Sequence, residues 1–171
     1  MKVIFLDNDG VLNYTDWYVS DRNPGNLDGQ DGDIDPRCVD RIIRICNETG
    51  AKIVMSSDWR IAWPGSRIRL EKAGFPEGLI IDKTTELIWR MISKGDYMRE
   101  DSAEVCYRYS RGREIDLWLE GHPECTNYVI LDDRSDFTEE QGPHFVHVDP
   151  KIGITDDDAE IAILILKHHG A

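Results

Sequence analysis

The sequence predicts an α/β protein, a three-layer sandwich with a mainly parallel, Rossmann-like sheet. Short apolar segments alternate with helix-like segments along the 171 residues, as expected for repeated strand–helix units. Three of the apolar segments end in polar side chains. Because the carboxyl ends of parallel strands meet at one edge of a sheet, where ligands bind, we expect these side chains to converge. The length fits a single domain spanning residues 1–171.

The first predicted strand, residues 2–6, ends in two carboxylates, Asp7 and Asp9, followed by Gly10. Side chains two apart in an extended strand point the same way, so the two carboxylates share one volume. Like charges this close repel unless a cation or a shared proton relieves them. The pattern therefore indicates a magnesium-dependent aspartyl nucleophile, with a turn or a calcium loop as the structural alternative.

A loop and a helix separate this strand from the next one. Residues 13–35 are rich in glycine, aspartate, asparagine and aromatic residues, and their length suits a flap rather than a folded cap domain. Asp35 as N-cap and Pro36 after it predict a helix that Gly50 ends.

The second apolar strand, residues 52–55, leads into Ser56, Ser57, Trp59 and Arg60. Hydroxyls and a cation at a strand end suit an anionic ligand. A packed hydroxyl is the alternative for Ser56, and Trp59 fits either the core or a substrate platform.

The third polar strand end comes late in the chain. A strand beginning at residue 127 ends in the adjacent carboxylates Asp132 and Asp133, and Arg134 follows. Residues 83–110 mix aromatic and charged side chains and are interpreted as a possible small insertion. The other predicted elements are a helix over 66–73, a strand over 78–82, a helix over 114–119, a strand over 143–149 and a helix over 161–166 behind a capping box at 155–158.

Charge and hydropathy restrict the partners and the compartment. A formal net charge of −13 argues against an extended nucleic-acid groove, which needs clustered lysine and arginine. Binding of only the end of a nucleic-acid strand is compatible with this charge. No uncharged apolar stretch is long enough to span a bilayer, and Asp7 interrupts the first apolar run, so we expect no membrane partner and a cytoplasmic protein. The oligomeric state is left open.

With these residues assembled, the sequence resembles the haloacid dehalogenase superfamily of phosphotransferases. Asp7-x-Asp9-Gly-Val is similar to its first motif, Ser56 to its second, a basic residue near Arg111 to its third, and Asp132-Asp133 to its fourth. Finer similarity is to the capless branch found with RNA-repair proteins and to the phosphatase half of phage polynucleotide kinase-phosphatases. The strings that carry it are Ser56-Ser57-x-Trp59-Arg60, Arg111-Gly-x-Glu114-Ile-x-x-Trp118-Leu119 and Leu131-Asp-Asp-Arg134.

The resemblance implies catalytic roles and a Mg²⁺ cofactor. Asp7 would attack phosphorus, and Asp9 would protonate the leaving alcohol and then deprotonate water. Asp7, the Asp9 carbonyl and Asp132, backed by Asp133, would hold Mg²⁺.

The same resemblance implies residues that hold the substrate. Ser56 and a cation, Arg111 or Arg113, would hold the phosphoryl oxygens. Ser57 and Arg60 would add substrate contacts.

Three functions follow as hypotheses. The first is a capless, magnesium-dependent phosphomonoesterase whose phosphorylated substrate is a nucleic-acid 3′-phosphate end. The second is a small-metabolite or nucleotide phosphatase with residues 13–35 or 83–110 folded over the site. The third is a non-catalytic phosphate- or metal-binding module.

Overall fold

A computed structural model describes residues 1–28, 32–87 and 110–168 and confirms the α/β architecture. Within these residues one sheet has the order β3-β2-β1-β4-β5, and every neighbouring pair is parallel. Its strands are β1 (Lys2–Leu6), β2 (Lys52–Met55), β3 (Ile80–Lys83), β4 (Asn127–Asp132) and β5 (Phe145–His147).

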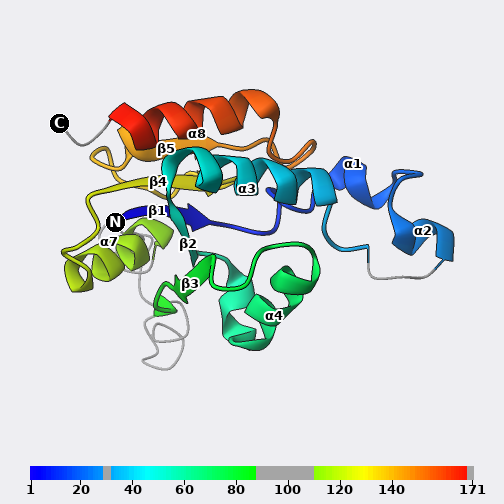
Figure 1. Cartoon of the computed structure of the whole chain (residues 1–171), viewed down its shortest axis with the longest axis horizontal. Coiled ribbons are helices and arrows are strands. Elements are labelled where there is room, and N and C mark those ends of the chain that lie inside the picture. The colour runs from blue at the N-terminus through cyan, green and yellow to red at the C-terminus, as the bar shows by residue number, and fades with distance from the viewer. Residues whose placement is uncertain (29–31, 88–109, 169–171) are drawn as a thin grey trace, which may run out of the picture.

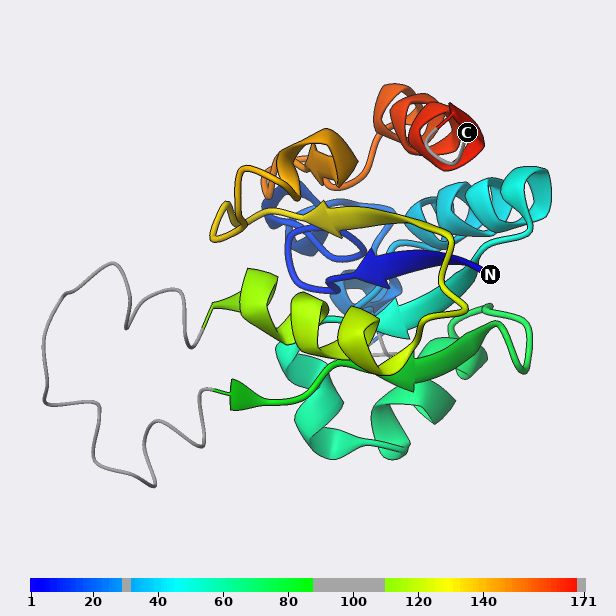
Figure 2. The same ribbon diagram turned by 90° about the vertical axis from the view of Figure 1, so that its left-hand side faces the viewer.

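Helices cover both faces of this sheet, which gives the three predicted layers. Helices α3 (Pro36–Thr49) and α8 (Asp156–His168) lie on one face and α7 (Arg111–Gly121) on the other (Figures 1 and 2). The alternation of β1 explains this division. Ile4 and Leu6 belong to the core under α3 and α8, whereas Val3 and Phe5, which alternate with them, belong to the core under α7.

The ends of the two long helices follow the predicted signals. Asp35 caps α3 through its side chain, Pro36 occupies the first turn, and Gly50 ends the helix in a left-handed conformation with φ 73°. Before α8, Thr155 and Asp158 form the capping box, with side-chain to backbone hydrogen bonds of 3.2 and 2.9 Å.

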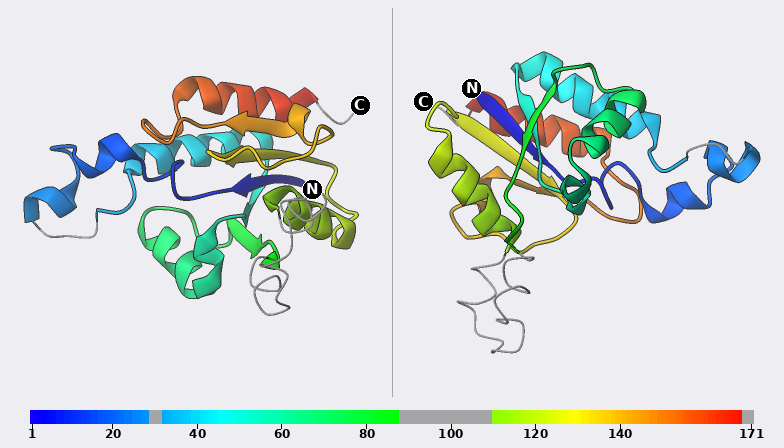
Figure 3. Two further views of the ribbon diagram at one scale, coloured as in Figure 1. Left: turned by 180° about the vertical axis from the view of Figure 1, so that it is seen from behind. Right: turned by 90° about the horizontal axis from the view of Figure 1, so that it is seen from below.

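The segment predicted as a flap, residues 13–35, contains two short helices, α1 (Thr15–Tyr18) and α2 (Pro24–Asp28). The indole Nε1 of Trp17 donates to the Gly32 carbonyl at 2.6 Å and ties the segment together. Figure 3 shows α1 and α2 projecting at the end toward which the strands point. This segment therefore lies at the carboxyl edge of the sheet.

Shorter helical segments complete the described part: η1 (Asp58–Ala62), α4 (Gly65–Lys72) and η3 (Gly142–His144). Most of the insertion predicted at 83–110 lies outside the described residues. Among the helices that are described, none combines the length and apolar character needed to cross a bilayer.

The sheet register brings the three polar strand ends together. Leu6 of β1 pairs with Met55 of β2 on one side and with Leu131 of β4 on the other. The chain leaves β1 toward β2 and β3 and returns to β4 on the opposite side, so the strand order reverses here. Such a reversal is where open α/β sheets bind ligands. The residues that follow these paired positions are Asp7, Ser56 and Asp132.

Candidate active site

Asp7 lies at the centre of the carboxyl edge. Its backbone N–H donates to the Leu131 carbonyl at 3.0 Å, which continues the β1–β4 ladder by one residue. Its side chain is buried, with Oδ1 3.1 Å from Nη1 of Arg111, and it also hydrogen-bonds to Ser57. Burial raises the pKa of Asp7, and the charge of Arg111 opposes that shift. The carboxylate is thus held in place and poorly solvated.

Asp132 is the last residue of β4 and Asp133 follows it, directly beside Asp7. Asp132 is fully buried; its Oδ1 accepts from the Arg134 backbone N–H at 2.9 Å and its Oδ2 lies 3.2 Å from Nη1 of Arg111. Burial raises the pKa of Asp132 to about 7, Arg111 opposes the rise, and the nearby Asp7 adds to it. With Asp58 at 3.5 Å, three carboxylates contact the Arg111 guanidinium, whose single charge offsets only part of theirs.

These carboxylates fit a magnesium ion. Asp7, Asp132 and Asp133 each offer one oxygen, and the three oxygens lie within 4.8 Å of one another. Mg²⁺ is commonly held by a few carboxylates together with water. Gly10 leaves room for this group, because it has φ 81° and an added Cβ would lie 2.7 Å from the Asp133 carboxyl carbon.

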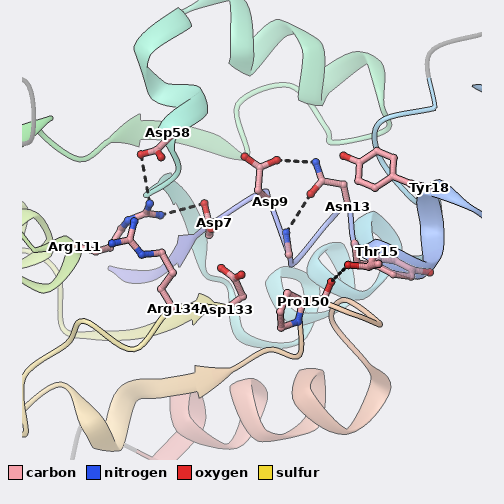
Figure 4. Close-up of a pocket in the computed structure, with 12 residues that line it drawn as sticks. Asp7, Asp9, Asn13, Thr15, Tyr18, Asp58, Arg111, Asp133, Arg134 and Pro150 are labelled. Carbon is pink, nitrogen blue, oxygen red and sulfur yellow. Dashed lines mark hydrogen bonds and ion pairs between the residues drawn. The ribbon is translucent and has the colours of Figure 1, made fainter.

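Asp9 faces the same pocket but stands apart from these three carboxylates. Its carboxylate is exposed and accepts from two side chains, Asn13 Nδ2 at 2.8 Å and Trp59 Nε1 at 3.1 and 3.2 Å (Figure 4 shows the Asn13 contact). Asn13 is itself oriented, because its Oδ1 accepts from the Gly10 N–H at 3.1 Å. A carboxylate held at the pocket wall by neutral donors suits proton transfer.

The two serines after β2 lie beside Asp7 in different ways. Ser56 is buried, its carbonyl accepts from Nη1 of Arg111, and its Oγ has no hydrogen-bond partner among the described residues. Ser57 hydrogen-bonds to Asp7, and its Oγ accepts from the Trp59 backbone N–H at 3.3 Å. Both therefore belong to the carboxyl edge, although neither lines the pocket directly.

The start of α7 decides between the two candidate arginines. Ser110 caps the helix, and Asp136 accepts from the Arg111 backbone N–H at 3.0 Å. Arg111 then points into the site, whereas Arg113, about 200° further around the helix, pairs with Glu120 at 2.8 Å. The structure places Arg111 against Asp7 and corrects the predicted substrate contact of Arg113, because that side chain leaves the site.

Arg60 is a second correction. Its guanidinium is buried and pairs with both oxygens of Glu114 at 2.7 and 2.8 Å. Glu114 also accepts from the Leu87 N–H at 2.9 Å. Arg60 therefore joins η1 to α7, and its side chain is not among those that line the pocket.

A pocket with a volume of about 370 Å³ opens over these residues (Figure 4). Sequence reasoning gave no role to several residues of its wall. Adjacency could have indicated two of them, because Asp58 follows the serines and Arg134 follows the paired aspartates. The lining is Asp7, Asp9, Gly10, Asn13, Tyr14, Thr15, Tyr18, Asp58, Arg111, Asp133, Arg134 and Pro150.

Comparison with protein families gives a match over most of the chain. A family described as the HAD domain in Swiss Army Knife RNA repair proteins matches residues 3–159. No curated protein and no solved structure matches the chain. The match covers the sheet, the carboxyl edge and most of the helices described above. The chain therefore belongs to the family of HAD domains found in Swiss Army Knife RNA repair proteins.

Proposed function

We propose that this protein is a magnesium-dependent phosphomonoesterase that works through an aspartyl-phosphate on Asp7. The observation that carries the proposal is the placement of the Asp7 carboxylate, 3.1 Å from Arg111 and beside Asp132 and Asp133. A nucleophilic carboxylate next to a cation and a metal-type carboxylate group is suited to phosphoryl transfer. Membership of the HAD domain family supports a phosphatase-type activity.

The reaction would proceed in two displacements. An Asp7 oxygen attacks phosphorus, the bond from phosphorus to the leaving oxygen breaks, and Asp9 gives that oxygen its proton. A water molecule then attacks phosphorus of the aspartyl-phosphate, the bond to Asp7 breaks, and Asp9 takes the proton of the water. Inorganic phosphate is released, and Asp9 returns to its first protonation state.

Arg111 would stabilise the phosphoryl oxygens. Its Nη1 contacts Asp7, Asp132 and the Ser56 carbonyl, whereas Nη2 faces Asp58 on the pocket side at 3.5 Å. Nη2 is therefore the donor that a phosphoryl oxygen can reach. A bound Mg²⁺ would supply charge neutralisation between nucleophile and phosphate.

The proposed substrate is a nucleic-acid 3′-phosphate end. The family description, with its reference to RNA repair, supports this choice. A single terminal phosphate, gripped locally, is also compatible with the net charge of −13. A second candidate is a small phosphorylated metabolite or a nucleotide, because Tyr14, Thr15 and Tyr18 of the 13–35 segment line the pocket and add a wall to it.

A phosphate-release assay tests both the activity and the substrate. The panel is p-nitrophenyl phosphate, mononucleotides, and oligonucleotides carrying a 3′- or a 5′-phosphate, each with Mg²⁺ and with EDTA. We expect Mg²⁺-dependent release and a preference for the 3′-phosphorylated oligonucleotide. Turnover of mononucleotides without turnover of any oligonucleotide would favour the small-substrate candidate instead.

Asp7→Asn is the matched variant for the nucleophile. The amide is nearly isosteric but cannot form the acyl phosphate, so activity should fall at least ~10³-fold. The fold should persist, because the change removes a buried carboxylate whose pKa is raised. An Asp7→Asn protein that keeps most of its activity would refute the proposal.

A further inference from the structure

Trp59 connects two motifs that lie 50 residues apart. Its indole Nε1 lies 3.2 Å from Oδ1 and 3.1 Å from Oδ2 of Asp9, so one N–H is shared by both carboxylate oxygens. The indole reaches Asp9 from η1, whereas Asp9 stands in the loop after β1. No local pattern in the sequence requires this contact.

The indole is held from several directions. Ser57 accepts from the Trp59 backbone N–H at 3.3 Å and so fixes the first turn of η1. The guanidinium carbon of Arg69 lies 4.9 Å from the centre of the indole ring, in cation–π contact, and Arg69 pairs with Asp33 of the flap segment. An N–H held in this way presents a fixed direction to its acceptor.

The second donor on Asp9 makes its two oxygens different. Asn13 Nδ2 donates to Oδ1 at 2.8 Å, so Oδ1 accepts from both Asn13 and Trp59. Oδ2 accepts from Trp59 alone among the described residues. A carboxylate oxygen has room for two hydrogen bonds, so Oδ2 keeps a lone pair for a further proton.

We infer that Trp59 is a positioning residue that holds Oδ2 of Asp9 toward the leaving group. The inference rests on the proposed function, in which Asp9 is the acid and base. Asn13 holds only Oδ1, and the indole N–H adds the hydrogen bond to Oδ2 that fixes the rotation of this exposed carboxylate. Proton transfer needs a donor within hydrogen-bond reach of the reacting oxygen, so a loosely held Asp9 transfers its proton less often.

The test uses leaving groups of different quality with Trp59→Phe. Phenylalanine keeps an aromatic ring against Arg69 and removes the N–H. An alkyl phosphate such as glycerol phosphate leaves as a strongly basic alkoxide and needs protonation, whereas p-nitrophenolate leaves without it. We expect kcat/KM for the alkyl phosphate to fall about tenfold, which is less than the full rate contribution of a general acid. For p-nitrophenyl phosphate, kcat/KM should change less than about twofold, because its leaving group needs no proton.

The value of kcat/KM reports the first displacement, because it includes no step after the alcohol leaves. A loss of folded protein would lower kcat/KM for both substrates by the same factor. The ratio of the two kcat/KM values is therefore the readout. A second variant with benzothienylalanine at position 59 keeps the size of the indole and replaces the N–H by sulfur. It should show the same ratio as Trp59→Phe.

Trp63→Phe is the matched control. Trp63 is the C-cap of η1, the guanidinium carbon of Arg67 lies 5.4 Å from the centre of its ring, and it does not line the pocket. The same chemical change there should leave the ratio of the two substrates at its wild-type value.

Two active-site variants separate this inference from the proposed function. Asp9→Asn should lower kcat/KM for the alkyl phosphate more strongly than Trp59→Phe does. Asp7→Asn should abolish activity on both substrates. An unchanged ratio in Trp59→Phe, together with a changed ratio in Asp9→Asn, overturns the positioning role and leaves the proposed function standing. Wild-type-like activity of Asp7→Asn overturns the proposed function itself.

Discussion

Replacement of Asp132 by asparagine should stabilise the metal-free protein and weaken its binding of Mg²⁺. Asp132 is fully buried next to Asp7, and its pKa is raised from 3.8 to about 7 by burial and by that neighbouring carboxylate. The folded protein therefore holds this proton more tightly than the unfolded chain does. Stability from this group is complete at low pH and is lost as the pH rises through about 7.

The size of the effect follows from the shift. A change of about three units at about 1.4 kcal/mol per unit gives on the order of 4 kcal/mol against the ionised, metal-free site at pH 8. Asparagine has no charge to bury and can still accept from the backbone N–H that Asp132 Oδ1 binds at 2.9 Å. Even half of this free energy should raise the melting temperature by about 4 to 8 °C in a domain of this length.

Thermal unfolding in EDTA at pH 6 and pH 8 measures this directly. At pH 8 the Asp132→Asn protein should melt above wild type, and the difference should shrink at pH 6 because Asp132 is then largely protonated. Added Mg²⁺ should raise the melting temperature of wild type far more than that of the variant, since binding to the native state stabilises it. Asp40→Asn, at an exposed position on α3, is the control and should melt like wild type.

Two results would refute this reasoning. Equal melting temperatures of wild type and Asp132→Asn in EDTA at pH 8 would show that ionised Asp132 does not destabilise the folded protein. Identical dependence of their activities on Mg²⁺ would show that Asp132 is not a ligand.

Gly10→Ala should raise the Mg²⁺ concentration for half-maximal activity about tenfold, because its Cβ would meet the Asp133 carboxyl at 2.7 Å; a Mg²⁺ titration of activity measures it. Glu114→Gln should lower the free energy of unfolding by about 3 kcal/mol in urea, because the buried Arg60 loses its closest counter-charge and keeps only Asp58 at 3.7 Å. The double change Arg60→Met and Glu114→Leu should recover most of that loss, and a failure to recover would mean that the pair has a further role. Raising salt at saturating Mg²⁺ should leave the rate on 3′-phosphorylated oligonucleotides steady or improve it, since the chain carries a net charge of −13; steep inhibition would reveal a cationic track.

The sheet and its carboxyl edge could be predicted from the sequence because strand signals are local. An apolar run of four to six residues ending in a polar side chain identifies a buried strand and its end without knowledge of the rest of the chain. The long helices could also be predicted, because Asp35, Gly50 and the capping box at Thr155 mark their ends. The short helices α1 and α2 were not predicted, because four or five residues carry no periodic pattern.

The sequence by itself also determined which residue types meet at the edge. Parallel strands place their carboxyl ends at one edge of a sheet, so Asp7 and Asp132 were expected at the same edge once both runs were recognised as strands. That the two side chains lie next to each other depends on β1 and β4 being neighbours in register, which the structure shows.

Only the tertiary structure decided the partners of the charged side chains. Arg111 rather than Arg113 enters the site because caps from Ser110 and from the distant Asp136 set where α7 begins. Arg60 turns inward because Glu114, 54 residues away, offers it a buried carboxylate. Such contacts join elements that are far apart in the sequence. A local sequence pattern predicts which face of a helix or strand a residue occupies, but it does not predict which residue of another element lies opposite.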